Sequence, residues 1–316
     1  MTAATDDLTT LGRALGPAVL PDHPLGALTT YRVGGRAALF IAPRDEKQLV
    51  EVGRALKGLR VPVLVVGNGS NLLVSDRGFP GLVVSLTDGF DTLSVDGGAV
   101  TAGAGLSLPV LARRTAAAGW HGLEWAVGVP GTVGGAIRMN AGGHGSDTAA
   151  TLITYRWVDL RSGEVHEAPA ERLGFAYRHS DLLPTDAVVA GVFQLEPGDP
   201  AAGKAIVDEI VRWRRAHQPG GSNAGSVFTN PPGDSAGRMI EACGLKGFRW
   251  GTAEVSPRHA NFIQADPGGS ADDVLRLIGH VRSVVAGATG VTLRPEVRLV
   301  GFSDTEAESV ARDGAR

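Results

Sequence analysis

The sequence predicts an α+β protein of three consecutive parts, on the basis of three observations. Its 316 residues are enough for two or three domains of ordinary size. Short strand-like segments and turns prevail from Thr29 to about residue 200, whereas helical periodicity prevails in the last third. The 45 glycines, about twice the average share, cluster at 67–69, 103–105, 128–145 and 219–225. We therefore expect a leader (1–24), a first lobe (25–86), a second lobe (87–200), a third domain (201–302) and a charged, disordered tail (303–316).

The first lobe is predicted to have a small βαββ arrangement. Asp45 to Leu56 has helical spacing, with Leu49 and Val52 on the same face as Leu56. Three short apolar runs of strand length accompany this helix, at 39–42, 61–66 and 81–86. The second run ends directly at a glycine-rich segment, so we expect a loop at the end of that strand.

The second lobe is predicted to consist mainly of strands. Residues 154–160 alternate in polarity, 161–164 form a turn signal, and 165–168 return, which indicates a β-hairpin. We expect a short helix at 108–118 and another strand at 188–195. The segment 197–200, Pro-Gly-Asp-Pro, is typical of a domain boundary.

The third domain is predicted to contain two long helices and a terminal strand at 297–302. The first helix spans 205–216, with Ile206, Ile210 and Trp213 on one stripe. The second begins at Ser270, which has a carboxylate three residues later, as in a capping box. Behind this cap, apolar residues keep helical period as far as Gly287.

Several classes of function are excluded by composition. A net charge of −3 gives no general attraction to nucleic acid or to an anionic membrane. The chain has no apolar run of about 18 residues and no signal-peptide pattern at its start, so we expect a cytoplasmic protein. The single cysteine, Cys243, cannot form an internal disulfide, and we expect it to be a buried apolar residue. The eight histidines show no metal-ligand spacing, so no metal is predicted.

Two glycine-rich loops are candidates for ligand binding. The first, 67–71, follows a strand but has Leu72 where the dinucleotide fingerprint needs its third glycine, so a Rossmann fold is not expected. The second extends from Gly128 to Ala136 and on to 140–145. Glycines let the backbone approach a ligand closely. We expect these loops to hold a large flat or phosphorylated ligand, although tight turns of a β-rich fold remain an alternative.

Three polar residues are candidate catalytic residues, but each also has a simpler structural interpretation. Arg178, at the end of a strand-like segment, could receive a carboxylate with its planar fork or be a surface residue. Ser226 lacks a hydrolase motif and is more simply a turn residue. Glu296 could be a solvated charge. The residues taken singly do not decide between these readings.

Eight motifs in a fixed order carry a resemblance to a known family. They are Thr30-Tyr-Arg-Val-Gly-Gly35, Gly67-Asn-Gly-Ser-Asn71, Gly128-Val-Pro-Gly-Thr-Val-Gly-Gly135, Tyr177-Arg-His-Ser180, Ala224-Gly-Ser-Val-Phe-Thr-Asn-Pro231, Gly244-Leu-Lys-Gly247, Val255-Ser-Pro-Arg-His-Ala-Asn-Phe262 and Leu293-Arg-Pro-Glu296. From about residue 25 to residue 302, the chain resembles the UDP-N-acetylenolpyruvoylglucosamine reductase (MurB) family. With no long insertion between Ser180 and Val188, it resembles the shorter subclass, which lacks an extra tyrosine loop.

The resemblance implies a two-lobed FAD-binding domain of the vanillyl-alcohol-oxidase (PCMH) type and a C-terminal α+β substrate-binding domain. It implies non-covalent FAD, NADPH as hydride donor, a UDP-sugar substrate and a monomer without nucleic-acid or membrane partners. Asn230 and Lys246 match substrate-binding positions. The implied cofactor-binding residues are Gly67, Asn68, Gly69, Ser70, Asn71, Gly128, Pro130, Gly131, Thr132, Gly134, Gly135 and Asn140.

The implied reaction reduces UDP-N-acetylglucosamine enolpyruvate to UDP-N-acetylmuramate for peptidoglycan synthesis. Arg178 and Glu296 match residues that stabilise the developing enolate-like charge, and Ser226 matches the residue that protonates C2. Thr229, where the family often has lysine, and residues 217–223 depart from the pattern. Three alternatives remain: a paralogue reducing another enol-ether or alkene, an FAD oxidase of the same superfold, and a flavin-binding module without catalysis.

Overall fold

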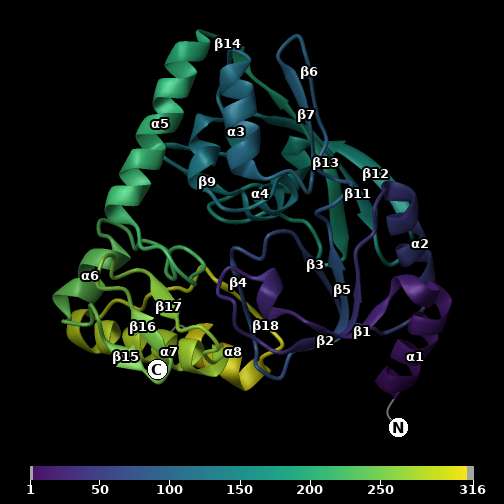
Figure 1. The fold of residues 1–316 in the computed structure, drawn as a ribbon. Helices are drawn as coiled ribbons and strands as arrows, with labels where there is room; N and C mark the ends of the chain where they lie inside the picture. The colour runs from purple at the N-terminus through teal and green to yellow at the C-terminus, as the bar shows by residue number, and fades with distance from the viewer. Residues whose placement is uncertain (1–2, 312–316) are drawn as a thin grey trace. The chain divides into compact units, whose positions relative to one another are not determined.

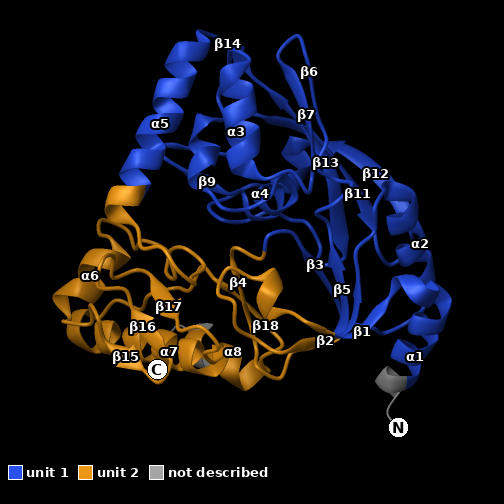
Figure 2. Cartoon of the chain, viewed as in Figure 1, with its two compact units in different colours: residues 1–22, 38–68, 81–214 blue, residues 23–37, 69–80, 215–316 orange. Residues whose placement is uncertain are grey.

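The computed structural model describes residues 3–311 and shows an α+β chain divided into two compact units. Unit 1 comprises residues 1–22, 38–68 and 81–214, and unit 2 comprises 23–37, 69–80 and 215–316 (Figure 2). Both units are thus assembled from stretches that alternate along the chain. This division cuts across the expected first lobe, 25–86, because two segments of that lobe, 23–37 and 69–80, belong to the unit formed by the C-terminal third.

A four-stranded sheet forms the first part of unit 1, with strand order β1-β2-β5-β3. The strands are β1 (Leu20–Pro24), β2 (Arg36–Ile41), β5 (Phe79–Ser85) and β3 (Val63–Val66), and β3 and β5 run parallel. Helices α1 (Ala3–Leu15) and α2 (Glu46–Leu56) accompany them. Asp45 caps α2 by accepting the N–H of Gln48 at 2.8 Å, and the apolar face of α2 is buried against the sheet. The predicted helix and strands of this lobe are confirmed.

A five-stranded antiparallel sheet forms the second part of unit 1, with strand order β12-β11-β13-β7-β6. The strands are β6 (Leu93–Asp96), β7 (Ala99–Gly103), β11 (Leu152–Asp159), β12 (Glu164–Pro169) and β13 (Asp186–Gln194). The predicted hairpin is β11–β12, with Asp159 opposite Glu164. Helix α2 lies beside it (Figure 1), close enough that a β-carbon on Gly53 would be 2.7 Å from Gly163 Cα.

The remaining elements of unit 1 are short, apart from α5. They are α3 (Leu108–Ala117), β8 (Trp120–His121), α4 (Val133–Met139), β9 (Gly142–Gly143), β10 (Ser146–Asp147), β14 (Glu196–Pro197) and α5 (Pro200–His217). Helix α5 starts earlier than predicted, and its expected apolar stripe is confirmed at Ile210 but wrong at the other two positions. Val207 and Ile210 are buried, whereas Ile206 and Trp213 are 42% and 44% exposed. The helical period of the sequence does not show whether Ile206 or Val207 faces the core. In the structure, Val207 packs in the unit 1 core.

Unit 2 is built around the long helix α7 (Ala271–Thr289). It packs on the antiparallel sheet β15-β16-β17, which consists of Arg249–Trp250, Ala253–Val255 and Ile263–Ala265, and on α6 (Ala236–Ala242). Ser270 caps α7 as predicted, accepting the N–H groups of Asp272 and Asp273 at 3.1 and 3.3 Å. The Asp273 carboxylate instead accepts both the N–H and the hydroxyl of Thr252 at 2.9 Å, which ties α7 to the sheet. Strand β18 (Arg298–Val300) pairs in parallel with β4 (Leu72–Val74).

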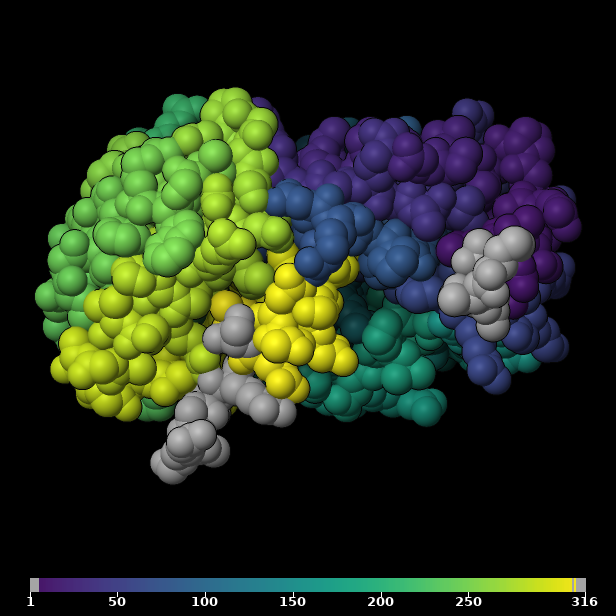
Figure 3. All heavy atoms as spheres, turned by 90° about the horizontal axis from the view of Figure 1, so that it is seen from below, coloured from purple at the N-terminus to yellow at the C-terminus, as the bar shows by residue number. Residues whose placement is uncertain are grey.

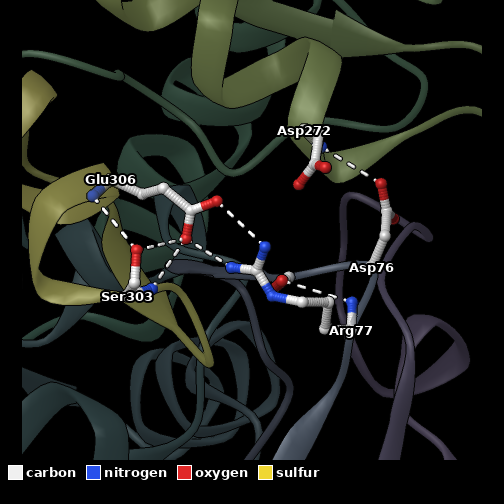
Figure 4. Close-up of polar contacts among 6 residues, drawn as sticks. Asp76, Arg77, Asp272, Ser303 and Glu306 are labelled. Atoms are coloured by element: carbon white, nitrogen blue, oxygen red, sulfur yellow. Dashed lines mark hydrogen bonds and ion pairs between the residues drawn. The ribbon is translucent and has the colours of Figure 1, made fainter.

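The expected tail contains a helix, α8 (Asp304–Ala311), so the prediction of disorder is wrong for these residues; 312–316 lie outside the described residues. Asp76 accepts bonds from Ser270 Oγ and Ala271 N at 2.6 and 3.0 Å. It also accepts the N–H of Asp272 at 3.2 Å, and Arg77 forms an ion pair with Glu306 (Figure 4). Val310 is 1% exposed in the core that contains α7, and the yellow C-terminal atoms adjoin the light-green ones in Figure 3. The ion pair of Glu306 with Arg77 and the burial of Val310 hold α8 in place, although its own sequence is mostly polar.

The structure also bears on the predictions for Cys243 and for membrane-spanning segments. Cys243 caps the end of α6 and is partly exposed, so it is not the fully buried residue that we expected. Within residues 3–311, no helix combines the length and the apolar character that crossing a membrane requires.

Candidate active site

The two predicted glycine loops meet within unit 1. Gly67 directly follows β3, and a β-carbon placed on it would lie 2.4 Å from Thr132 Oγ1. The side chain of Asn68 donates a hydrogen bond from Nδ2 to the carbonyl of Pro130, at 3.2 Å. Any larger residue at position 67 would therefore separate the first loop from the second.

The second loop leads into α4 and is also closely packed. Thr132 is the N-cap of α4 and accepts the N–H of Gly135 at 3.4 Å. A β-carbon on Gly134 would lie 2.9 Å from Ala104 Cβ. Backbone thus lines the meeting point of the two loops with few side chains, which fits a large phosphorylated cofactor held by main-chain groups.

Asn140 connects the second loop to the turn that carries Arg178. It ends α4 in the left-handed conformation, with φ 41°, and its Nδ2 donates to Asp147 Oδ2 and to the Ala176 carbonyl, each at 3.1 Å. Arg178 itself has φ 55° and donates from Nη2 to the carbonyl of Gly142 at 2.9 Å. Unit 1 therefore brings Arg178 to the glycine segment 140–145, on a turn and not at the end of a strand as predicted.

The rest of the first loop, Gly69 to Asn71, belongs to unit 2. Gly69 has φ 55°, and a β-carbon there would lie 2.1 Å from the carbonyl oxygen of Leu28, so only glycine fits. Asn71 donates from Nδ2 to the carbonyl of Glu296 at 3.1 Å and accepts the N–H of Arg298 at 2.9 Å. Asn71, a predicted cofactor-binding residue, thus binds the main chain of Glu296, a predicted catalytic residue.

Ser226 and Glu296 are brought to neighbouring positions in unit 2, while Arg178 is part of unit 1. Gly225, with φ 77°, turns the chain immediately before Ser226. The next residue, Val227, accepts the N–H of Glu296 at 2.7 Å through its carbonyl. The segment 226–229 therefore runs alongside 294–296, with a further bond from Thr229 N to Arg294 O at 2.9 Å.

A polar pocket of about 340 Å³ opens beside Ser226 in unit 2. The predicted substrate-binding residue Asn230 also lines it, whereas Lys246 does not, and instead binds the lining residue Glu241 at 2.9 Å. Hydroxyl, amide, carboxylate, guanidinium and imidazole groups share the wall, which is formed by Ser226, Asn230, Ser235, Gly237, Arg238, Glu241, Arg258, His259, Ala260 and Asn261.

Eight of the ten lining residues were not predicted to act in binding or catalysis, and the polar side chains among them include Arg238, Arg258, His259 and Asn261. Arg238 forms an ion pair with Asp234, and Arg258 Nη2 donates to the carbonyl of Arg215 at 2.6 Å. Burial lowers the pKa of His259 below its ordinary value, which favours the neutral imidazole at neutral pH. Arg258, His259 and Asn261 lie in the motif at 255–262, which carries the family resemblance but does not by itself indicate a role for any of them.

Comparison with known proteins identifies the family. Residues 217–300 match the model of the UDP-N-acetylenolpyruvoylglucosamine reductase C-terminal domain, and residues 37–169 match an FAD binding domain. A UDP-N-acetylenolpyruvoylglucosamine reductase of Heliobacterium modesticaldum is 44% identical over 92% of this chain and 93% of its own length. The chain belongs to this reductase family. The resemblance predicted from the eight motifs is thereby confirmed.

Two further relatives agree with this assignment. A reductase of the same name from a Synechococcus species is 46% identical over 88% of this chain and 92% of its own length. The crystal structure of the MurB reductase from Thermus caldophilus covers 89% of this chain and 98% of its own, with 35% identity and a TM-score of 0.78. The predicted fold class, an FAD-binding domain plus a MurB C-terminal domain of the α+β class, is also confirmed.

Proposed function

We propose that this chain reduces UDP-N-acetylglucosamine enolpyruvate to UDP-N-acetylmuramate, with NADPH as hydride donor and non-covalently bound FAD, in cytoplasmic peptidoglycan precursor synthesis. The observation that carries the proposal is the position of Ser226, which lines a polar pocket one residue away from the backbone bond to Glu296. Relatives that bear this reductase name span about nine tenths of the chain, which supports it.

The cofactor is assigned to the glycine loops at 67–71 and 128–135. In unit 1, Gly67, Asn68 and the loop from Gly128 to Gly135 offer closely packed backbone to the phosphates. The chemistry that bound FAD supplies is hydride transfer from NADPH to C3 of the enolpyruvyl group. The protein's part is then to orient the substrate and to manage charge and protons around it.

Three side chains receive roles in this proposal. Arg178 binds the substrate carboxylate, where a planar guanidinium stabilises the negative charge that develops as C3 gains a hydride. Glu296 acts on the same developing charge. Ser226 Oγ donates a proton to C2, whose carbanionic character makes even a weak acid sufficient, and a proton from solvent then restores the hydroxyl. Asn230, in the wall of the pocket, and Lys246 are assigned to the UDP-sugar.

The proposal is tested by separating the two half-reactions of the Ser226→Ala variant. Flavin reduction by NADPH, followed at 450 nm in a stopped-flow instrument, should match that of the native protein. Flavin reoxidation by the enolpyruvyl-sugar nucleotide should slow by roughly 100-fold or more, since general acid catalysis contributes about that much. Ser222→Ala is the matched control, because Ser222 is four residues earlier in the same segment and lies outside the pocket wall. Equal slowing of both half-reactions would remove Ser226 from the role of proton donor.

A substrate panel distinguishes the alternative functions. The purified protein should be yellow and should oxidise NADPH only when the enolpyruvyl-sugar nucleotide is present. Turnover with another enol-ether or alkene instead would indicate a paralogue, turnover with oxygen alone an oxidase, and bound flavin without either a binding module.

A further inference from the structure

Asn261 lies beside the segment that carries Ser226. It belongs to the connection between β16 and β17, lines the polar pocket and is only 3% exposed. A buried carboxamide has two donors and acceptor capacity that must be satisfied, and its orientation is therefore set by its partners.

Four hydrogen bonds fix Asn261, and three of them go to the Ser226 segment. Its side chain brackets Phe228, because Nδ2 donates to the Phe228 carbonyl at 2.8 Å and Oδ1 accepts the Phe228 N–H at 3.0 Å. Its carbonyl accepts the N–H of Val227 at 2.9 Å. The fourth bond anchors Asn261 itself, since its N–H donates to His259 Nδ1 at 3.3 Å.

These bonds determine where Ser226 lies. The Ser226 carbonyl, the Val227 N–H and the Cα atoms of both residues share one rigid peptide plane. The bond from Val227 N–H to the main-chain carbonyl of Asn261 orients that plane, and the two bonds of the Asn261 carboxamide to Phe228 keep the segment in line with that carbonyl. The bond from the Val227 carbonyl to Glu296 N–H holds the next plane at 2.7 Å. On its other flank, Ser226 follows Gly225, where a β-carbon would meet nothing within 4 Å, so side-chain packing there adds little constraint.

We infer that Asn261 is a positioning residue for the protonation step: it holds the 226–229 backbone so that the Ser226 hydroxyl lies where the substrate carbon needs a proton. The inference rests on the proposed function, because it assigns Asn261 an effect that acts only through Ser226. Phe228 and Val227 are each 1% exposed, so no bulk water reaches their backbone groups to replace Asn261. A displacement of about 1 Å in a catalytic group can slow a reaction on the order of 100-fold.

The first test compares half-reactions in Asn261→Ala. Flavin reduction by NADPH should stay within about twofold of the native rate, whereas the limiting rate of flavin reoxidation at saturating substrate should fall on the order of 100-fold. The substrate concentration at half-maximal rate should change far less. Gln264→Ala is the matched control, because this nearby amide donates to the Gly220 carbonyl at 2.8 Å and not to the 226–229 segment. Equal slowing of both half-reactions, or a change in apparent substrate affinity alone, would overturn the inference.

The second test uses Asn261→Asp, a nearly isosteric change that keeps the protein foldable. An ionised carboxylate there would oppose the Phe228 carbonyl, while a protonated carboxyl can donate to that carbonyl and still accept the Phe228 N–H. Burial raises the pKa of such a carboxyl. The reoxidation rate of Asn261→Asp, divided by the native rate at each pH, should therefore rise as pH falls, and the same ratio for Asn261→Ala should stay flat. If the ratio is independent of pH for both variants, the Asn261 side chain does not position the segment through its two hydrogen bonds to Phe228.

The double variant Ser226→Ala/Asn261→Ala separates this inference from the function on which it rests. If Asn261 acts through Ser226, the double variant should reoxidise no more than about threefold slower than Ser226→Ala alone, because coupled residues are not additive. A Ser226→Ala variant with native reoxidation would refute the proposed function and the inference together. A slow Ser226→Ala variant alongside native reoxidation in both Asn261 variants would refute the inference alone.

Discussion

Replacing Gly67 with alanine tests whether the two glycine loops of unit 1 form one cofactor cradle. The added β-carbon would lie 2.4 Å from Thr132 Oγ1, 3.1 Å from Cγ2 and 3.3 Å from Cβ. Because comfortable contacts need about 3.5 Å, the loops must separate by about 1 Å. Thr132 cannot easily move aside, since it is 2% exposed and its hydroxyl caps α4.

The expected magnitude follows from this overlap. Overpacking a well-packed site costs roughly 1–3 kcal/mol. If that strain is felt in the cofactor-bound state, the Kd for FAD rises by about 5- to 150-fold. Titration of the apoprotein with FAD, followed by quenching of flavin fluorescence, measures the change directly.

Gly287→Ala provides the control for this substitution. Gly287 lies in α7 of unit 2, outside both glycine loops, and a β-carbon there meets nothing within 4 Å. Its φ is not in the left-handed region, so alanine introduces no backbone strain. We expect its Kd for FAD to change less than about twofold.

A double variant with Thr132→Ala distinguishes steric overlap from other causes. Thr132→Ala removes Oγ1 and Cγ2, two of the three nearest atoms, so Gly67→Ala should weaken FAD binding less in that background than in the native one. Equal effects in the two backgrounds, or an unchanged Kd in Gly67→Ala itself, would refute the reasoning.

Two further predictions concern α8 and α5. The hydrogen bond from Arg77, and then those from Ser303, lower the pKa of Glu306 to about 2, so this carboxylate stabilises the fold above its ordinary pKa and loses that contribution as pH falls toward 2. Urea unfolding should therefore show a lower free energy of unfolding for Glu306→Gln than for the native protein at pH 7. This difference should shrink toward pH 3 and with added salt, and a difference independent of pH would contradict the ion pair. In α5, Val207→Ala should cost roughly 2 kcal/mol of unfolding free energy and Ile206→Ala less than about 0.5, and the reverse order would refute the burial that orients this helix.

Much of the secondary structure was predictable because its causes are local. Asp45 and Ser270 start their helices by accepting N–H groups within three residues, and the apolar spacing behind each cap continues to the helix end. The hairpin at 154–168 was predictable for the same reason, since its turn and its alternation lie within 15 residues. In α5 the period was visible but the buried side was not, because Val207 and Ile206 are both apolar neighbours and only the core distinguishes them.

Helix α8 shows what local pattern misses. Its sequence is polar and predicted a disordered tail, but Glu306 pairs with Arg77, which lies more than 200 residues earlier, and Val310 enters the core around α7. Such contacts have no signature in the segment itself. The two units likewise combine stretches such as 69–80 and 215–311 that no linear pattern connects.

The sequence by itself determined the family, through eight motifs in order, and it predicted that the glycine loops bind FAD. Taken singly, Ser226 was only a turn residue and Asn261 had no role, because neither carries a local signal of its function. The tertiary structure decided their relation: it placed the Asn261 carboxamide around Phe228, 33 residues away in the chain, and opened a polar pocket beside Ser226. The physical reason is that hydrogen bonds in a buried site depend on distance in space, which chain order does not encode.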